Sequence, residues 1–500
     1  MVGLNEQVAK GVIWTMGLRI TVRAVAFVST VILARLLTPE DFGLVAIIMS
    51  FFSLIDIFGD FGFDTVLIQK QNATIDHYHT AWSFNVTFGV VSCITVIGLS
   101  GIISDFYGNT KLQPIMLALS LLFLFNGFLN IGVVDFRKNM TFDKEFKFQI
   151  IPKLISFFCT IGLAFWLRNY WALVIGALVW KSCILINSYI LHSFRPKFTF
   201  SSGKDLFNFS KWLIINNFLN FVNTRSPEMI IGKILSPQAT GLFTIAQEIS
   251  TIPTVEIAAT VNRASYPGYS KISHQPEKLQ DLYINIMSSI SLIVIPAGVG
   301  VASIAGTLVP VVLGAQWHES IVLVQYLAIG GLLLALNSNT GFVFIAMGKP
   351  KISCVMDFLR ILILIPLLIG LPMLYGLEGV ALATLWTTMV TFCMYSSVIH
   401  LKLKIPWRRI LTLHFRPATA SIAMWLCVKA SQPLLYELYN QKEILVLISM
   451  VFIGVFVYGL SILLLWIFAG QPWGPERKII EYSINQIGKS KNSVGLKKAK

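Results

Sequence analysis

Charged residues and paired cysteines are scarce in this sequence. Only 13% of the 500 residues are charged, whereas 55% are hydrophobic. Soluble domains of this total length need more charged surface, so the composition excludes an ordinary soluble protein. The cysteines all fall inside apolar runs and show no spacing typical of a disulfide framework or a metal site, so we interpret them as buried thiols. They are Cys93, Cys159, Cys183, Cys354, Cys393 and Cys427.

Sequence motifs of enzymes are missing as well. There is no Walker A loop, so we expect no ATP hydrolysis by this chain. His77 and His79 stand in a short loop, which is more typical of a solvated loop than of a metal site. The segments between the apolar runs are too short to carry a glycosyltransferase, ligase or polymerase site. The sequence therefore predicts neither an enzyme nor a protein with a bound cofactor.

Long apolar runs recur from one end of the sequence to the other. Each holds roughly 18 to 25 mostly apolar residues, enough for a helix across a hydrocarbon core about 30 Å thick. The first run carries Arg19 and Arg23 and lacks a small-residue cleavage site, so we do not interpret it as a signal peptide. The alternation expected of barrel strands is missing, which favours helices. We predict about fourteen spans, near 11–35, 42–66, 80–104, 112–134, 148–167, 170–192, 208–233, 241–262, 284–313, 321–346, 352–374, 377–400, 415–432 and 443–468.

The lysine and arginine residues between these spans are unevenly distributed. With this set of spans, 25 of the 39 basic residues fall on one side of the membrane with both termini, and five fall on the other side. Cytoplasmic loops carry the excess of basic residues, so both termini are predicted to be cytoplasmic. This bias, together with attraction to anionic headgroups, accounts for the net charge of +15, and we expect no nucleic-acid partner.

One short stretch occurs twice. Leu36–Leu44 reads LLTPEDFGL, and Ile234–Leu242, 198 positions later, reads ILSPQATGL. In each copy a hydroxyl residue precedes a proline, which predicts an N-cap followed by Pro at the first helical position. Trp14 and Trp212 align at the same offset. Six spans separate the two copies, an even number, so the two repeats are predicted to cross the membrane in the same orientation.

The predicted fold is therefore an all-α polytopic membrane protein with two parallel six-helix repeats that form two lobes. We place the N-terminal lobe at 1–203, the C-terminal lobe at 204–405, two extra helices at 406–470 and a basic cytoplasmic tail at 471–500. Parallel repeats of this kind are typical of transporters whose substrate path lies between the lobes.

Nine basic residues lie within the predicted spans. Lys211, Arg263 and Lys429 are close enough to an end to extend into water. A charge at the bilayer centre costs roughly 3 kcal/mol or more, so the deeper cations should face a partner or a hydrated cavity. Arginine suits phosphate because its planar guanidinium donates two bonds at once. The candidates for binding an anionic substrate are Arg19, Arg23, Lys153, Lys181, Arg225 and Arg360.

Carboxylates occur at the same depth as these cations. Asp56, Asp60 and Asp64 recur every four residues along the second span. Two interpretations stay open: the acids form salt bridges within the bundle, or they line a hydrated cavity and exchange protons or Na⁺. The pairs Arg225–Glu228 and Asp357–Arg360, each three residues apart, would be instances of the first. The candidates for ion coupling are Asp56, Asp60, Glu248 and Glu256.

The run Ala34–Ala46, followed by Gly62-Phe63 and Leu67-Ile68-Gln69, resembles the polysaccharide transporter family. This family contains the Wzx-type flippases and the colanic-acid-type exporters of the MOP (multidrug/oligosaccharidyl-lipid/polysaccharide) superfamily. The predicted layout of six, six and two helices is similar to that of the family over nearly the whole chain. These residues mark the family and not the substrate, so the candidate site residues rest on charge placement alone.

The resemblance implies a function in exopolysaccharide, O-antigen or capsule biosynthesis. A chain of this family would move an undecaprenyl-diphosphate-linked oligosaccharide across the bacterial plasma membrane by alternating access. Implied partners are membrane lipids and the polymerase and glycosyltransferases of a glycan pathway. An ion-coupled multidrug antiporter of the same superfamily is the alternative, and it requires carboxylates to outnumber cations deep in the bundle.

Overall fold

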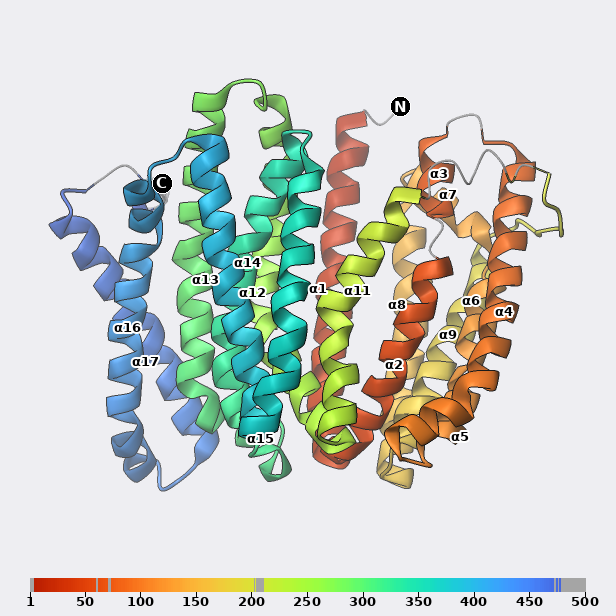
Figure 1. The fold of residues 1–500 in the computed structure, drawn as a ribbon, viewed down its shortest axis with the longest axis horizontal. Helices are drawn as coiled ribbons and strands as arrows, with labels where there is room; N and C mark the ends of the chain where they lie inside the picture. The colour runs from red at the N-terminus through yellow and green to blue at the C-terminus, as the bar shows by residue number, and fades with distance from the viewer. Residues whose placement is uncertain are drawn as a thin grey trace, which may run out of the picture. The chain divides into compact units, whose positions relative to one another are not determined.

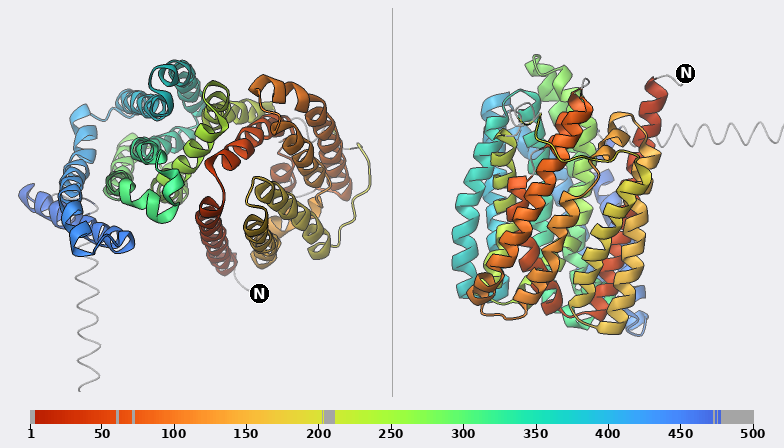
Figure 2. Two further views of the ribbon diagram at one scale, coloured as in Figure 1. Left: turned by 90° about the horizontal axis from the view of Figure 1, so that it is seen from below. Right: turned by 90° about the vertical axis from the view of Figure 1, so that its right-hand side faces the viewer.

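A computed structural model of the chain describes residues 4–59, 62–70, 73–201, 203, 211–471, 474, 476 and 477. Over these residues the chain is helical and contains no strand, which confirms the predicted all-α class. The helices separate into two compact units, Met1–Thr244 and Ile245–Lys500, which we describe one at a time. The helices of each unit run side by side along one direction (Figures 1 and 2).

The core of the first unit lies around the helix that begins in the first copy of the repeated stretch, Leu36–Leu44. Its core joins Leu44, Ile47 and Phe52 of one helix to Val96, Ile115 and Val174 of three others, all buried. Buried apolar groups of this kind hold the helices at fixed positions. The elements are α1 (Leu4–Leu36), α2 (Pro39–Gly59), α3 (Phe63–Gln69), α4 (Ile75–Tyr107), α5 (Leu112–Leu119), α6 (Leu121–Gly127), η1 (Ile131–Val133), α7 (Val134–Lys138), α8 (Phe142–Leu167), α9 (Trp171–Leu191), α11 (Lys211–Ile234) and the start of α12 (Pro237–Lys271).

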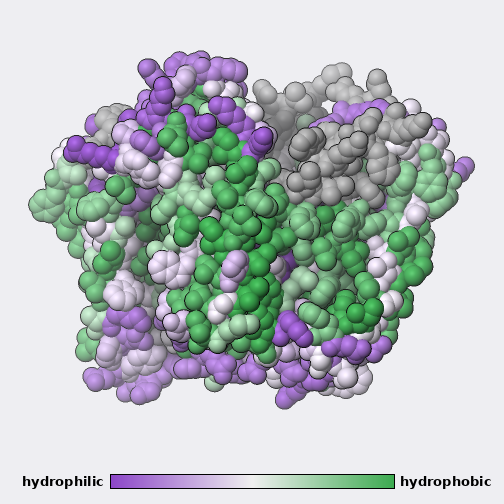
Figure 3. All heavy atoms as spheres, viewed as in Figure 1, coloured by the Kyte–Doolittle hydropathy of each residue, from purple (hydrophilic) through white to green (hydrophobic). Residues whose placement is uncertain are grey.

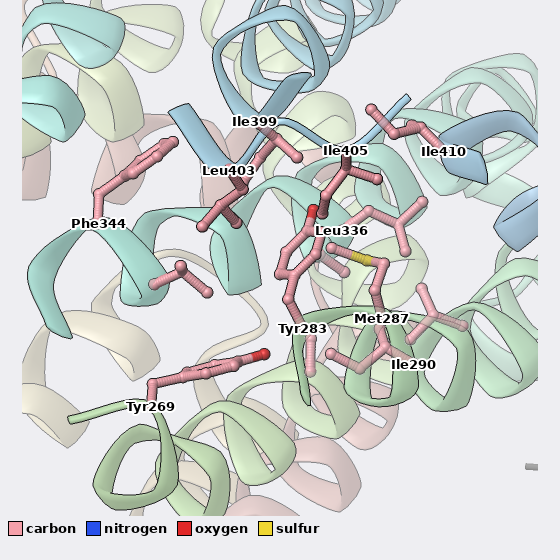
Figure 4. Close-up of a cluster of buried hydrophobic side chains, with 14 of the residues drawn as sticks. Tyr269, Tyr283, Met287, Ile290, Leu336, Phe344, Ile399, Leu403, Ile405 and Ile410 are labelled. Atoms are coloured by element: carbon pink, nitrogen blue, oxygen red, sulfur yellow. The ribbon is translucent and has the colours of Figure 1, made fainter. Parts of the chain in front are cut away.

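The second unit has its largest core where five helices meet. Tyr269 of α12 and Tyr283 of α13 extend into this cluster, and Leu403 of α15 faces them (Figure 4). Both tyrosine hydroxyls are hydrogen-bonded, to Asn339 and Thr340 of α14 at 3.1 and 3.0 Å, so their burial leaves no polar group unsatisfied. The elements that follow α12 are α13 (Pro276–Val312), η2 (Ala315–Trp317), α14 (Ser320–Ala346), α15 (Pro350–Leu403), α16 (Trp407–Leu438) and α17 (Glu443–Phe468).

The surface of each unit suits lipid. Large apolar side chains point outward, among them Phe468, 84% exposed, and Trp166, 81% exposed. In the space-filling view apolar residues cover the middle of the visible surface and hydrophilic residues gather at its ends (Figure 3). Water does not tolerate so much exposed apolar area, whereas a bilayer does.

Most predicted spans coincide with a helix or part of one over the described residues, but 42–66 and 112–134 are each divided among shorter elements, and the count of fourteen is not confirmed. Among the described residues, nine helices are long and apolar enough to cross a membrane, or ten with the bent pair Leu112–Gly127 and Ile131–Lys138. One of the nine, α15, covers two predicted spans. Its helical backbone is broken at Gly376 (φ 57°), between these two spans. The more polar α11, α12 and α16 fall short over their described residues.

The second predicted span is wrong at its end. It was expected to continue to residue 66, but α2 ends at Gly59 and a separate helix begins at Phe63. Gly62 between them has φ 65°, a left-handed conformation that ends a right-handed helix and favours glycine. Asp64 therefore belongs to α3 and does not continue the helix face that carries Asp56.

The repeated stretch starts a helix in both copies, as predicted. The Thr38 Oγ1 accepts the Asp41 N–H at 3.4 Å ahead of α2, and the Ser236 Oγ accepts the Ala239 N–H at 3.1 Å ahead of α12. The two helix starts also pack on each other. A Cβ at Gly43 would lie 1.7 Å from the Pro237 carbonyl oxygen, and one at Gly241 would lie 1.8 Å from the Pro39 carbonyl oxygen. Only glycine allows this backbone approach.

The division into units does not follow the predicted lobe boundary at 203/204. The structure packs α11 against α2 and so includes it in the first unit. The lobes are defined by the sequence repeat, so they stay a prediction. Residues 204–210 and most of the predicted tail, 471–500, lie outside the described part of the chain.

Candidate functional site

The first unit contains a polar cavity of about 400 Å³. Asp56 comes from the last turn of α2, Asp64 from the start of α3, Asn85 from α4 and Asn126 from α6. Aromatic rings of Phe88 and Phe123 line the same space. Polar groups on apolar helices are costly unless they meet a partner or water, so this cavity is the first candidate for ligand or ion binding in the unit.

A line of polar side chains leads away from this cavity. The Lys181 ammonium of α9 donates to the Asn126 Oδ1 at 3.1 Å, and the Asp56 carboxylate attracts it electrostatically. The same ammonium nitrogen lies 5.6 Å from the centroid of the Trp180 ring, and the Lys153 nitrogen of α8 lies 5.2 Å from that centroid. Two predicted cations, at positions 153 and 181, thus share one indole.

Close packing of α8 on α9 brings these side chains together. A Cβ at Gly176 would lie 2.1 Å from the Thr160 Oγ1, and the Ser156 hydroxyl donates to the Gly176 carbonyl at 3.0 Å. Small residues at this contact let the two backbones approach. Lys153 and Trp180 line a hollow of about 160 Å³ just beside it.

Arg19 and Arg23 are exposed on α1, which packs along α8. The register is given by the ring of Trp14, which lies 5.2 Å from that of Phe146, and further along by Val25, which lines the hollow beside Lys153. Both arginines lie between these two levels on α1. The structure therefore gathers four predicted cations, at positions 19, 23, 153 and 181, on neighbouring helices of the first unit.

Arg225 stands in an ion pair within α11. Its Nη1 lies 3.0 and 3.2 Å from the two carboxylate oxygens of Glu228, which is buried. The Ser50 hydroxyl of α2 donates to the same carboxylate at 2.5 Å. The sequence allowed two roles for Arg225, a salt bridge or substrate binding, and the structure shows the salt bridge. The contact of Glu228 with Ser50 joins α11 to α2.

Arg360 belongs to the second unit, where α15 holds it near Asp357 and Tyr395. Its Nε is buried without a hydrogen-bond partner. A guanidinium nitrogen in this state is costly, so the group is suited to receive an acceptor. The carboxylates Glu248 and Glu256, on α12, are partly buried. Asp60 lies outside the described residues, and the described part of the chain contains no cluster of three or more His, Cys, Asp or Glu side chains arranged to hold a metal.

Sequence reasoning missed Asn126, Asn85 and Trp180. Asn126 lies 55 residues from its partner Lys181, and no local pattern signals such a contact. Trp180 offered a signal, because it directly precedes a lysine inside an apolar span. A tryptophan inside an apolar span is usually interpreted as packing, however, so this signal is weak.

Lys111 and His192 of the first unit lie just beyond the ends of helices that are long and apolar enough to cross a membrane. At one end the Lys111 ammonium donates to Glu40 at 2.8 Å, which raises the lysine pKa. At another, the His192 Nδ1 accepts the Phe194 N–H at 3.2 Å, and its Nε2 lies 3.5 Å from Asp135. Asp135 favours the charged imidazolium, but burial outweighs it and lowers the His192 pKa, with Lys144 and Arg195 acting in the same direction as burial.

We expect His192 to make the stability of this protein depend on pH. Below a pH of about 6.5 the unfolded chain protonates this side chain, whereas the folded chain does so only at lower pH. The free energy of unfolding should therefore fall as the pH falls through and below this value. In His192→Asn, whose amide oxygen can still accept the Phe194 N–H, this contribution disappears. Unfolding midpoints of both proteins at pH 5.0, 6.0 and 7.5 measure it, and equal slopes for the two would contradict it.

Comparison with known proteins identifies a family and several relatives. Residues 32–322 match the model of a family described as polysaccharide biosynthesis protein. The lipopolysaccharide biosynthesis protein WzxC of Escherichia coli (strain K12) is 25% identical over 390 residues, 76% of this chain and 78% of that protein. The teichuronic acid biosynthesis protein TuaB of Bacillus subtilis (strain 168) is 24% identical over 76% of this chain and 77% of its own length.

Two solved structures share the fold. The lipid II flippase MurJ, in an inward closed conformation, superposes with a TM-score of 0.72 at 15% identity and covers 92% of this chain and 99% of MurJ. An inward-facing multidrug resistance MATE transporter of the MOP superfamily gives 0.57 at 15% identity, over 76% of this chain and 94% of its own. At this identity the likeness shows the fold alone. Because the family model covers more than half of the sequence, this chain belongs to the polysaccharide biosynthesis protein family, in line with the resemblance carried by the run from Ala34 to Ala46.

Proposed function

We propose that this protein is a flippase that moves an undecaprenyl-diphosphate-linked oligosaccharide across the bacterial plasma membrane by alternating access. The observation that carries the proposal is the group of cations in the first unit, where Lys153 and Lys181 share the Trp180 ring beside a polar cavity. Apolar packing does not account for two ammonium groups at one indole, whereas a bound anionic substrate would stabilise both charges. Membership of the family and the names of WzxC and TuaB support the same function.

The diphosphate of the substrate is held by cations from several helices. Arg19 and Arg23 present planar guanidinium groups, which can donate two bonds to one phosphate. Lys181 keeps two further N–H donors beside the one given to Asn126. Arg360 of the second unit is a separate candidate, because its Nε is buried without an acceptor. Arg225 is the weakest candidate, because the two oxygens of Glu228 already occupy its Nη1.

A coupling ion acts through Asp56. The carboxylate attracts Lys181 and so competes with an anionic substrate for the same ammonium. A proton or Na⁺ that neutralises Asp56 leaves Lys181 available to the substrate, and release of the ion restores the competition. Asp60, Glu248 and Glu256 are further candidates for the same exchange. The polyprenyl tail stays in lipid, no covalent step is needed, and the termini are cytoplasmic.

The partners in this proposal are enzymes of the same glycan pathway. Glycosyltransferases assemble the lipid-linked unit on the cytoplasmic side and a polymerase consumes it on the outer side. The alternative, a multidrug antiporter, would take cationic drugs. The two ammonium groups at Trp180 disfavour a cationic ligand there.

Loss of the cations should abolish transport without loss of the protein. We expect Lys181→Gln to lower the transport rate by about 10-fold or more, because a hydrogen bond to a charged group contributes about 1.5–3 kcal/mol. Arg19→Gln combined with Arg23→Gln should have at least as large an effect. The measurement is protection of an undecaprenyl-diphosphate oligosaccharide in proteoliposomes from an added glycosidase, at equal protein content.

A matched control is Lys233→Gln. This lysine also lies over an aromatic ring, that of Phe106, at 4.5 Å from the centroid, but at the end of α11. It should transport like the unaltered protein. Equal rates for all four proteins would refute the cation site, and efflux of cationic drugs without glycan transport would establish the antiporter instead.

A further inference from the structure

The group of Lys153, Trp180 and Lys181 has a feature that binding of a diphosphate does not explain. A diphosphate is charged on all sides and has no apolar face to set against an indole. The Trp180 side chain is 36% exposed and lines a hollow together with Lys153. An exposed aromatic ring with two cations close to it suits a ligand that is apolar on one face and acidic at one edge.

We propose that this group recognises an acidic sugar of the translocated oligosaccharide, a pyranose ring that carries a carboxylate or a comparable acidic substituent. This assignment rests on the flippase function proposed above and names the class of glycan that it carries. The C–H face of the pyranose packs on the Trp180 indole, and the acidic group lies between the Lys153 and Lys181 ammonium groups.

The distances fit one acidic substituent. The two ammonium nitrogens lie 5.2 and 5.6 Å from the same ring centroid, so both can reach a group at the edge of a sugar stacked there. Two ammonium groups this close to one indole favour an anion placed between them. A carboxylate replaces cation–π contacts with charge-assisted hydrogen bonds, which are stronger.

The hollow offers a single sugar ring both apolar walls, such as Phe157 and Leu173, and a few hydroxyl groups. Its volume of about 160 Å³ is below the roughly 300–1,000 Å³ of pockets for drug-sized ligands, which fits a single ring. Ser156 and Thr160 line it, and their hydroxyl protons are used in bonds to the carbonyls of Gly176 and Ser156. Their oxygens therefore remain as acceptors for sugar hydroxyl groups.

The experiment compares two substrates that differ only in the acidic group. The full-length protein in nanodiscs is titrated with undecaprenyl-diphosphate disaccharides that end in glucuronic acid or in glucose, and binding is followed by native mass spectrometry. We expect the acidic lipid to bind about 10- to 100-fold more tightly, as for one group paired with two cations. In Lys153→Gln and in Trp180→Leu this ratio should fall to about 3 or less, whereas Trp180→Phe retains most of it.

Trp166→Leu is the matched control, because this tryptophan is 81% exposed on the neighbouring part of α8 and should leave the ratio unchanged. Equal affinity of the unaltered protein for the two disaccharides overturns the acidic-sugar assignment and leaves the flippase function standing. Failure to bind or transport either lipid overturns the flippase function itself. A preference that survives both Lys153→Gln and Trp180→Leu places the recognition elsewhere and also refutes the assignment.

Discussion

Replacing Gly43 by alanine is expected to destabilise the protein by about 3 kcal/mol or more, at the upper end of what overpacking costs. The added Cβ would lie 1.7 Å from the Pro237 carbonyl oxygen and 2.9 Å from the Gly241 nitrogen. Both neighbours are backbone atoms, so no side chain can rotate away and the starts of α2 and α12 must separate. Gly241→Ala should cost a similar amount, since its Cβ would lie 1.8 Å from the Pro39 carbonyl oxygen.

The two substitutions meet at one contact, so their effects should not add. Once Gly43→Ala has separated the helices, Gly241→Ala finds more space, and the double variant should cost clearly less than the sum of the single ones. Gly98→Ala and Gly162→Ala are matched controls in α4 and α8, where a Cβ would meet nothing within 4 Å. There alanine should stabilise by up to about 1 kcal/mol. Unfolding midpoints of the purified proteins in detergent distinguish the two classes, and additive losses would contradict a shared contact.

Local signals predicted much of the fold. Thr38-Pro39 and Ser236-Pro237 mark helix starts because caps depend on a few adjacent residues, and both helices begin at the proline. The break at Gly376 lies between two predicted spans, because a glycine also acts on the backbone locally. Gly59 and Gly62 also signalled a break, but the regular spacing of Asp56, Asp60 and Asp64 concealed it. A spacing of four residues is compatible with a helix and does not require one.

The site depends on contacts that no local pattern contains. Charge within apolar spans identified Lys153 and Lys181, because burial of an unneeded charge is costly anywhere in the chain. Their arrangement around Trp180 depends on the register of α8 on α9, which the Gly176–Thr160 contact determines. The same holds for Arg225. Its spacing from Glu228 allowed a salt bridge, but only the third partner, Ser50, shows that the carboxylate also connects two helices.

Removing Arg225 should therefore act through Glu228. The Glu228 side chain is 4% exposed and that of Arg225 is 43% exposed, so the loss of the arginine leaves the more deeply buried charge without its counterion. We expect Arg225→Met to cost about 3–5 kcal/mol of stability at pH 7, the usual result of breaking a buried pair. Protonation of the remaining carboxyl limits this loss. Protonating a glutamate carboxyl whose pKa is ordinarily about 4.3 costs about 3.7 kcal/mol at pH 7 and about 1 kcal/mol at pH 5. The loss of stability in Arg225→Met should therefore be smaller at pH 5 than at pH 7.

The double variant Arg225→Met/Glu228→Met decides between the two roles that the sequence left open. Apolar residues in place of a buried ion pair are often neutral or stabilising, so this variant should recover most of the stability that Arg225→Met loses. If Arg225 serves structure alone, the double variant also recovers oligosaccharide transport at equal protein level. If Arg225 binds the diphosphate, stability returns and transport does not. Midpoints of unfolding and transport rates measured on the same three preparations separate these outcomes, and a double variant as unstable as Arg225→Met would show that the loss does not come from the unpaired Glu228 carboxylate.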